Sequence, residues 1–280
     1  FEYNTATKGN PSGGADGLKP EKSTQWTTGF RLEPSPAFSF GADLWNVQIR
    51  DQIGIIPEDA AFADGVLYSE LFVVVADPIS GSPTLTFLQV PKNLGTAHYQ
   101  GIDLDAESHI GTPVGRLSTR AHMTYMLKGD YQFTPGGEKH TSLDRLGADS
   151  KVNFRWILNV SSTLEAGAFT HTLTANFKPG YLDKPGYVVY RNADGTPGDD
   201  LAEDDPLAKR RVGSYSTFDW QTRYAVSKDF AITGGIRNVF DTNPPFTAQD
   251  EGPTGNARGF DGRYTDPTGR AFYLAGSYKF

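Results

Sequence analysis

Three carboxylates stand at alternate positions of one extended segment, at Asp103, Asp105 and Glu107. Because successive side chains of a strand point to opposite faces, all three lie on the same face. Such a row can bind a metal ion or act in acid–base catalysis. It can also form a ladder of charges in a polar interior, with Arg116 and Arg120 of the next segment beside it. We favour the polar ladder over a metal or catalytic site.

Other kinds of catalytic or metal site find no support in the sequence. The chain has no cysteine, which excludes thiol nucleophiles, disulfides and cysteine-ligated metals. It also lacks the motifs of serine hydrolases, phosphate-binding loops and zinc peptidases. The histidines are scattered and predict no metal centre: His98, His109, His122, His140 and His171. We therefore expect neither an enzyme nor a cofactor-binding protein.

Charge and hydropathy exclude two further classes. Lysine and arginine number 26 and aspartate and glutamate 33, so the formal net charge is −7, which argues against a general nucleic-acid-binding surface. No apolar run approaches the ~18 residues of a transmembrane helix. The 31 glycines and 18 phenylalanines favour a turn-rich, aromatic β protein instead.

Apolar and polar residues alternate in stretches of about ten residues, the length of a tilted strand that crosses a bilayer. The clearest stretches are 116–128 and 151–164. We predict nine strands, at about 23–33, 37–55, 95–110, 115–130, 150–164, 168–181, 213–226, 230–242 and 269–280. The connections alternate between tight turns and long segments, with turns at 34–36, 111–114, 165–167 and 227–229 and long segments at 56–94, 131–149, 182–212 and 243–268. This alternation is typical of an outer-membrane antiparallel barrel.

Charge decides which face of the predicted sheet meets lipid. In 116–128 one row is apolar from Leu117 to Leu127, whereas the other contains Arg116, Arg120 and Lys128. Because a basic residue at the bilayer midplane costs about 2–4 kcal/mol, we expect the apolar row to face outward. The expected lumen-facing residues are Asp103, Asp105, Glu107, Arg116 and Arg120.

The predicted turn at 111–114 also sets a register. Residues whose numbers sum to about 225 then lie opposite one another, which places Asp105 across from Arg120 and Glu107 across from Ser118. A half-buried sheet of a soluble protein shows the same alternation and stays an alternative to the barrel.

Several local motifs resemble the C-terminal barrel of TonB-dependent outer-membrane receptors, in that family's order. Residues 18–23 (LKPEKS) resemble its entry into a middle strand, and 93–95 (NLG) followed by 101–104 (GIDL) resemble a later strand. Residues 235–241 (GIRNVFD) match its penultimate-strand signature. The chain ends at Phe280 in an alternating aromatic row similar to the terminal signal of outer-membrane barrels.

The resemblance implies an all-β fold, a transmembrane antiparallel β-barrel of which this chain, residues 1–280, forms about nine C-terminal strands of the 22-stranded type. The family's plug domain, its periplasmic energy-coupling segment and the first barrel strands are not matched in this sequence. The implied function is energy-coupled nutrient uptake across the outer membrane of a Gram-negative bacterium. The implied partners are outer-membrane lipid and lipopolysaccharide, the plug domain, the inner-membrane TonB energy complex and the nutrient. We expect no nucleic acid as partner and a periplasmic C-terminus.

The resemblance also implies that long extracellular loops, together with inward residues near the outer mouth, supply the ligand contacts. Aromatic rings and guanidinium groups in two of these loops suit an anionic iron chelate or a sugar. The candidates are Tyr187, Tyr190, Arg191, Phe246, Arg258, Phe260, Arg263 and Tyr264. A ferric siderophore is the default ligand, with cobalamin, oligosaccharides and peptides as alternatives.

Two other classes of protein stay open. One is a complete small outer-membrane barrel, a hydrolase or an adhesin of ten strands, in which Phe1, Tyr3 and Thr5 begin an additional strand. The other is a soluble β-rich binding module.

Overall fold

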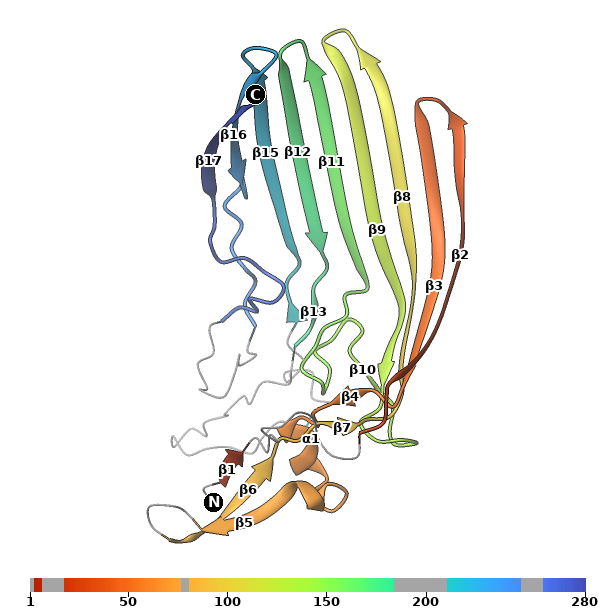
Figure 1. The fold of residues 1–280 in the computed structure, drawn as a ribbon, viewed down its shortest axis with the longest axis vertical. Coiled ribbons are helices and arrows are strands. Elements are labelled where there is room, and N and C mark those ends of the chain that lie inside the picture. Colours follow the sequence, from red (N-terminus) through yellow and green to blue (C-terminus); the bar gives the residue numbers. More distant parts are fainter. Residues whose placement is uncertain (1–2, 7–17, 77–80, 184–210, 248–258) are drawn as a thin grey trace, which may run out of the picture. The chain divides into compact units, whose positions relative to one another are not determined.

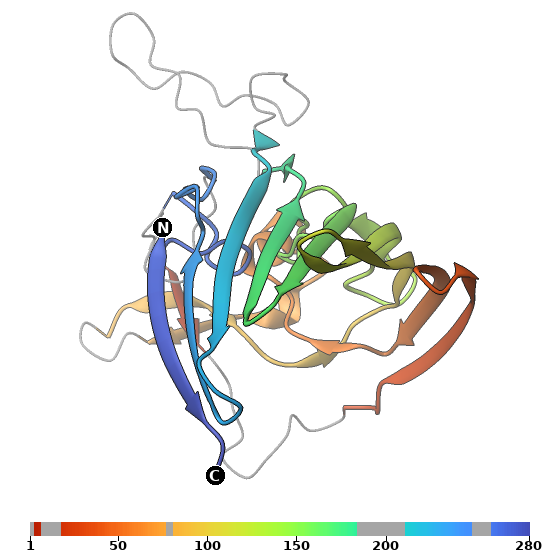
Figure 2. The ribbon, with the colours of Figure 1, turned by 90° about the horizontal axis from the view of Figure 1, so that it is seen from above.

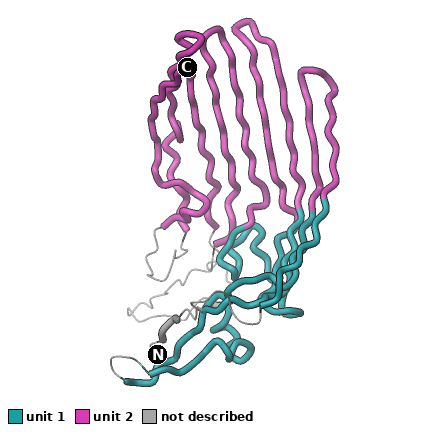
Figure 3. Tube along the Cα trace, viewed as in Figure 1, with its two compact units in different colours: residues 1–26, 46–100, 128–152 teal, residues 27–45, 101–127, 153–280 magenta. Residues whose placement is uncertain are grey.

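A computed structural model describes residues 3–6, 18–76, 81–183, 211–247 and 259–280. Within these ranges nearly all regular structure is β, and the helical elements are α1 (Glu58–Ala63) and the single 3₁₀ turn η1 (Ser69–Leu71). None of the described helices has the length and apolar character needed to cross a membrane. Two compact units divide the chain, as Figure 3 shows.

Unit 2 (residues 27–45, 101–127 and 153–280) contains most of one large antiparallel sheet, and four strands of this sheet continue into unit 1. The nine strands of the sheet follow one another in chain order, side by side in Figure 1 and along a curve in Figure 2. They are β2 (Lys22–Ser35), β3 (Phe38–Arg50), β8 (Ala97–Thr112), β9 (Gly115–Tyr131), β11 (Trp156–Ala166), β12 (Phe169–Lys178), β15 (Tyr215–Ala225), β16 (Phe230–Arg237) and β17 (Ala271–Tyr278). The nine predicted strands are thereby confirmed, in an open sheet with β2 and β17 at its edges.

Tight turns join the strands at one end of this sheet, as predicted. Two residues suffice between β8 and β9, and two between β11 and β12, where Gly167 has a φ of +60°. Glycine adopts this left-handed conformation without the steric cost that a Cβ atom imposes. Nearest-neighbour strands with two-residue connections can only be antiparallel, which is the arrangement of the whole sheet.

The two faces of the sheet differ sharply in polarity. On one face Leu173 lies opposite Trp220, and both side chains are exposed, at 48% and 43%. On the other face Thr174 lies between Ser161 and Asp219 on the neighbouring strands. A large apolar surface that the chain leaves uncovered indicates contact with a nonaqueous surrounding or a partner.

Unit 1 (residues 1–26, 46–100 and 128–152) contains a small folded region where the sequence predicted a long loop at 56–94. Here β5 (Phe72–Ala76) and β6 (Pro83–Leu88) form a hairpin, and β4 (Ile53–Gly54) pairs with β7 (Lys92–Asn93). The segment forms structure because its apolar side chains pack into one core with Ala97, Tyr131 and Phe133. Its buried members are Ile56, Ala61, Tyr68, Leu71, Phe87, Leu94, Ala97, Tyr131 and Phe133.

Short two-residue strands complete the described elements. In unit 1, β10 (His140–Thr141) pairs with the end of β9. In unit 2, β13 (Tyr181–Leu182) pairs with β14 (Arg211–Val212). Both pairs are antiparallel and lie beyond the ends of long strands of the sheet.

Two expectations from the sequence are wrong. The fifth strand begins at Trp156 rather than 150, because Val152 bridges to Leu146 and Phe154 is buried against the rings of Tyr181 and Tyr264. The additional strand of the ten-stranded alternative exists as β1 (Tyr3–Ala6), but it pairs in parallel with β6. It therefore does not extend the large sheet, and this alternative loses its tenth strand.

Candidate functional site

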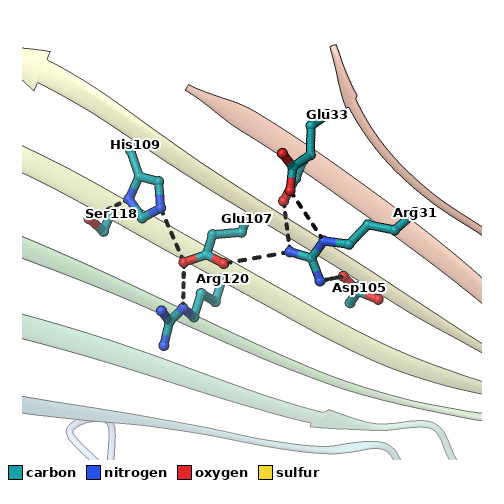
Figure 4. A network of polar contacts seen from close by, with 8 residues as sticks. Arg31, Glu33, Asp105, Glu107, His109, Ser118 and Arg120 are labelled. Atoms are coloured by element: carbon teal, nitrogen blue, oxygen red, sulfur yellow. Dashed lines mark hydrogen bonds and ion pairs between the residues drawn. The ribbon is translucent and has the colours of Figure 1, made fainter. Parts of the chain in front are cut away.

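A network of charged side chains crosses the polar face of β2, β8 and β9 in unit 2, with Glu107 at its centre (Figure 4). The Glu107 carboxylate accepts a hydrogen bond from Arg120 Nε at 2.8 Å. It also lies 3.2 Å from His109 Nε2 and 3.9 Å from an Arg31 guanidinium nitrogen. One carboxylate thus serves three basic groups on three strands.

Further members fix the orientation of this network. Arg31 also contacts Asp105 at 3.5 Å and Glu33 at 3.8 Å, and it donates a hydrogen bond to Ser39 Oγ at 2.9 Å. The other ring nitrogen of His109, Nδ1, is 2.9 Å from Ser118 Oγ. Each charge of the network therefore has at least one partner of opposite sign on the polar face of the sheet.

The predicted register of β8 and β9 is wrong by two residues. The side chains in contact are Glu107 with Arg120 and His109 with Ser118, so opposing residues sum to 227 instead of 225. The turn contains two residues, whereas the sequence suggested four at 111–114. Since side chains alternate with a period of two, a shift of two residues leaves every side chain on its predicted face.

The remaining residues of the predicted lumen-facing set lie close to the network. Asp103 accepts a hydrogen bond from Thr124 at 2.7 Å, and Arg116 lies directly opposite Glu165 of β11. Within the described ranges no three acidic, histidine or cysteine side chains are placed to hold a metal ion. The row from Asp103 to Glu107 is a ladder of pairs with donors on neighbouring strands.

A cavity of about 490 Å³ lies on the same polar face, at the end of the sheet away from the tight turns. Its floor consists of inward positions on β11, β12, β15, β16 and β17, and residues 262–269 cover it. The lining includes Asn159, Asn176, Lys178, Tyr215, Thr217, Asp219, Arg237, Arg263, Tyr264, Thr265 and Asp266. Ile157, Leu158, Phe177 and Ala271 also line it, so the cavity combines hydrogen-bonding groups with an apolar surface.

Neutral hydrogen-bonding groups make up the floor. The amide of Asn159 donates to Asn176 Oδ1 at 2.6 Å, and the amide of Asn176 reaches Thr217 Oγ1 at 3.5 Å. Register places these residues directly opposite one another on β11, β12 and β15. Amides and hydroxyls can donate and accept, so this row offers both kinds of partner to a ligand.

The segment above the cavity is tied to the wall through its backbone. Lys178 Nζ donates to the Tyr264 carbonyl at 2.7 Å, and Tyr215 Oη donates to the Asp266 carbonyl at 3.1 Å. The Arg263 guanidinium donates two hydrogen bonds to the buried Asp261 carboxylate, at 2.9 and 2.7 Å. These anchors give the roof a defined position although it has no regular secondary structure.

Charged groups of both signs line the cavity. Lys178, Arg237 and Arg263 line it together with two carboxylates, Asp219 and Asp266. Asp219 already accepts the backbone N–H of Asn238 at 2.8 Å. Hydrogen bonds from Thr268 lower the pKa of Asp266, with Arg237 adding to the effect, so this carboxylate is charged. Arg263 is already paired with Asp261, so Lys178 and Arg237 balance Asp219 and Asp266, and the lining carries no net charge.

The predicted ligand residues divide into three groups. Arg263 and Tyr264 line the cavity, and the Arg263 guanidinium lies 5.1 Å from the centre of the Tyr264 ring. Phe246 and Phe260 are described but do not line it, and Phe246 is 61% exposed. Tyr187, Tyr190, Arg191 and Arg258 lie outside the described residues.

Sequence reasoning missed the cavity floor. Asn159, Asn176 and Thr217 are small neutral residues on strands, and only pairing across β11, β12 and β15 brings them together. Lys178 and Arg237 sit at the ends of β12 and β16. Each occupies the polar row of its strand near a long loop, which is where inward ligand contacts are expected, although the sequence pointed to no individual residue there.

Comparison with known proteins identifies the family. The model of the TonB dependent receptor-like β-barrel family matches residues 1–239. The chain belongs to this family. Its members are outer-membrane proteins, and receptors rather than enzymes. No curated protein sequence matches the chain.

Solved receptor barrels share the fold. A point mutant of the ferric enterobactin receptor PfeA from Pseudomonas aeruginosa, in complex with enterobactin, is 17% identical with a TM-score of 0.60 over 99% of this chain and 33% of its own. The siderophore receptor PirA from Acinetobacter baumannii is 14% identical, with a TM-score of 0.57, and the match covers 94% of this chain and 32% of PirA. The transporter YddB from Escherichia coli is 16% identical, with a TM-score of 0.59, and the match covers 100% of this chain and 35% of YddB. The chain thus spans about a third of the length of these structures.

In this TonB-dependent receptor barrel segment, the signature at 235–241 has a structural explanation. Asn238 has a φ of +50°, and its amide exchanges two hydrogen bonds of 2.9 Å with the backbone of Thr242. Asp241 has a φ of +56° and accepts the backbone N–H of Arg270 at 2.7 Å. Asparagine and aspartate tolerate this conformation better than other side chains. The signature ends β16 with a turn that is closed by these hydrogen bonds.

Proposed function

We propose that this chain is the C-terminal part of the barrel of an outer-membrane receptor that imports a scarce nutrient with energy from the inner membrane. The observation that carries the proposal is the family match over residues 1–239. The polar cavity at the end away from the tight turns supports it, because in outer-membrane barrels the long loops and the mouth beside them are extracellular. In the complete receptor a plug domain and a TonB-type energy complex act with this barrel.

The ligand we propose is a ferric siderophore. Two of the matched structures are named siderophore or ferric enterobactin receptors, and one holds enterobactin. Lys178 and Arg237 in the lining of the cavity can donate charge-assisted hydrogen bonds to an anionic chelate. Cobalamin, oligosaccharides and peptides are the alternatives, and the neutral row of Asn159 and Asn176 is the feature that an oligosaccharide would use.

The membrane orientation of the strands follows from the same reasoning. The end of the sheet with tight turns is periplasmic, and Tyr278 of β17 pairs with Phe230 at that end, so we place the C-terminus in the periplasm. The row from Asp103 to Glu107 and the residues Arg116 and Arg120 then face the lumen. We propose that their free hydrogen-bonding capacity contacts the plug, and that the opposite face meets lipid and lipopolysaccharide.

Uptake by the full-length protein tests this proposal. Cells that lack the receptor gene are complemented with wild-type protein or with the double variant Lys178→Gln, Arg237→Gln, and radioactive iron is supplied as ferric siderophores of several chemical classes. We expect uptake that depends on the receptor and on TonB, with KM raised about 100-fold in the variant for two lost charge-assisted contacts.

The control is a double variant with the same charge change away from the cavity, Lys128→Gln, Arg223→Gln. It should take up iron like the wild type. Receptor-dependent uptake of a neutral sugar or of cobalamin, with no siderophore transported, would replace the proposed ligand. An absence of any receptor-dependent uptake, together with ester hydrolysis or cell adhesion by the purified protein, would overturn the transport function.

A further inference from the structure

A second cavity, of about 280 Å³, lies within unit 1 at the ends of β3, β8 and β9. Its size is near the lower end of small-molecule sites, about 300 Å³. The polar residues of its lining are Gln48, Arg50, Thr96, His98, Asp130, Gln132 and Lys139. None of them belongs to the charged network around Glu107 or lines the cavity of 490 Å³, so this cavity requires its own explanation.

Two side-chain contacts show that the strand ends have a common polar face. Thr96 Oγ1 donates to Gln132 Oε1 at 2.6 Å, across the ends of β8 and β9. His98 Nε2 lies 2.6 Å from Oδ1 of the buried Asn46, across β8 and β3. Side chains of neighbouring strands meet in this way when they point to the same face of a sheet. Because Thr96 and His98 are two residues apart, both contacts lie on one face.

Alternation along the strands places two charged groups on this polar face. Arg50 follows Asn46 by four residues on β3, and Asp130 precedes Gln132 by two residues at the end of β9. Residues separated by an even number of positions along a strand share a face, so both charged side chains lie on the polar face. The ring of Tyr131 points to the opposite face, where it is buried in the core of unit 1.

The pairing of β9 with β10 places a third charge. His140 of β10 pairs with Tyr131, and the two rings stack with their centres 5.6 Å apart. Lys139 directly precedes His140, so alternation turns its side chain away from the stacked rings and toward the face of Asp130. The polar face of the cavity therefore carries two cations and one carboxylate.

The three charges of this cavity are not paired with one another. Within the described ranges, no oppositely charged group lies within 4 Å of Arg50, Asp130 or Lys139, and none of the three makes a side-chain hydrogen bond. A neutral group between them is satisfied instead, since Gln132 Nε2 donates to the Gly137 carbonyl at 2.6 Å. Opposite charges that share a cavity without meeting can together bind a ligand that carries charges of both signs.

We propose that this cavity binds an amino dicarboxylic acid, with glutamate as the representative. The two carboxylates of the ligand bind Arg50 and Lys139, and its ammonium group binds Asp130. The charge count selects this class, because a dicarboxylate without the ammonium group leaves Asp130 without a partner, and an amino acid with a single carboxylate leaves one cation without a partner. The proposal concerns unit 1 alone and does not rest on the proposed uptake function.

Calorimetric titration of the full-length receptor in detergent with three probes tests the proposal. L-glutamate carries all three charges, glutarate lacks the ammonium group, and L-alanine lacks the second carboxylate. The variants Arg50→Gln and Asp130→Asn each remove one charge of the cavity. Arg223→Gln is the control, because it removes an arginine of unit 2 that lines neither cavity. Heat-dependent gel migration verifies that all the proteins are folded.

The wild type and Arg223→Gln should bind L-glutamate alike, and about tenfold more tightly than glutarate or L-alanine. Arg50→Gln should weaken the binding of both L-glutamate and glutarate about tenfold. Asp130→Asn should weaken the binding of L-glutamate about tenfold without weakening that of glutarate, which has no ammonium group to lose its partner. Equal weakening of these two probes by Asp130→Asn, equal affinity of the wild type for all three probes, or no binding of L-glutamate by the wild type would overturn the site.

Discussion

The substitution Arg263→Gln tests whether the segment above the large cavity is held by its side chains. Arg263 donates two hydrogen bonds to Asp261, whose side chain is 2% exposed, while that of Arg263 is 39% exposed. Around this pair, Tyr264 and Thr265 donate backbone N–H groups to the Asp261 carbonyl, at 3.2 and 3.0 Å. Glutamine is too short and uncharged to replace the bidentate contact.

The magnitude follows from burial. Removing one partner of a fully buried ion pair costs about 3–5 kcal/mol, because the other charge stays buried without compensation. Arg263 is partly exposed, and Asp261 keeps its hydrogen bond from the Arg263 backbone N–H at 3.0 Å, so we expect roughly 2 kcal/mol. Local opening of residues 259–270 would then become about 30-fold more frequent.

Hydrogen–deuterium exchange of the full-length receptor, followed by mass spectrometry of peptides that cover residues 259–270, measures this opening. Peptides from β12 and β15 should exchange as in the wild type. Arg223→Gln is the matched control, since it removes an arginine from the polar face of β15 away from this segment. In the double variant Asp261→Asn, Arg263→Gln, the loss in free energy of local opening should be smaller than the sum of the losses in the two single variants.

Two results would refute the reasoning. Exchange in 259–270 that stays within about threefold of the wild type would mean that the backbone anchors alone hold the segment, since threefold corresponds to well under 1 kcal/mol. An equal acceleration in Arg223→Gln would mean that the effect comes from the charge of the barrel interior rather than from the pair.

Three further predictions concern a glycine of the large sheet, the two faces of that sheet and the buried Tyr181. Gly101→Ala should lower unfolding stability by about 1–3 kcal/mol, measured from heat-dependent gel migration, because the added Cβ would lie 2.5 Å from the Trp45 ring. Leu173→Arg should destabilise the barrel by about 2–4 kcal/mol in vesicles, whereas Thr172→Arg on the other face should be tolerated. Burial raises the pKa of Tyr181 to about 12. Its contribution to stability, about 2–3 kcal/mol, is therefore complete below pH ~10 and is lost as the pH rises through 12. Hydrogen exchange of the paired strands β13 and β14, measured against pH, reports this loss.

Each of these predictions has a control and a contrary outcome. Gly111→Ala adds a Cβ to open space, so it should be neutral, and equal losses at Gly101 and Gly111 would contradict the packing argument. A tolerated arginine at Leu173 together with a disruptive one at Thr172 would reverse the two faces of the sheet. In Tyr181→Phe the alkaline loss should vanish, and a loss that persists belongs to another group.

The sequence by itself determined the strands, their order and their two faces. Residues such as Leu117, Leu173 and Trp220 on alternate positions carry a period of two, which is a local property of the chain and needs no tertiary information. The motif at 235–241 was readable for the same reason, because Asn238 and Asp241 form their turn with backbone groups a few residues away. Family membership rests on such local patterns in a fixed order.

Only the tertiary structure decided the register, the folded region of unit 1 and the sites. The register of β8 and β9 depends on whether the turn contains two residues or four. For this sequence the two turns differ little in free energy, so the local residues do not select one of them. The core around Phe87 and Leu71 forms between residues far apart in the chain, so no periodic pattern in the sequence predicts it. The cavity likewise exists because pairing of β11, β12 and β15 aligns Asn159 with Asn176 and Thr217, and a contact across strands has no signature within any one of them.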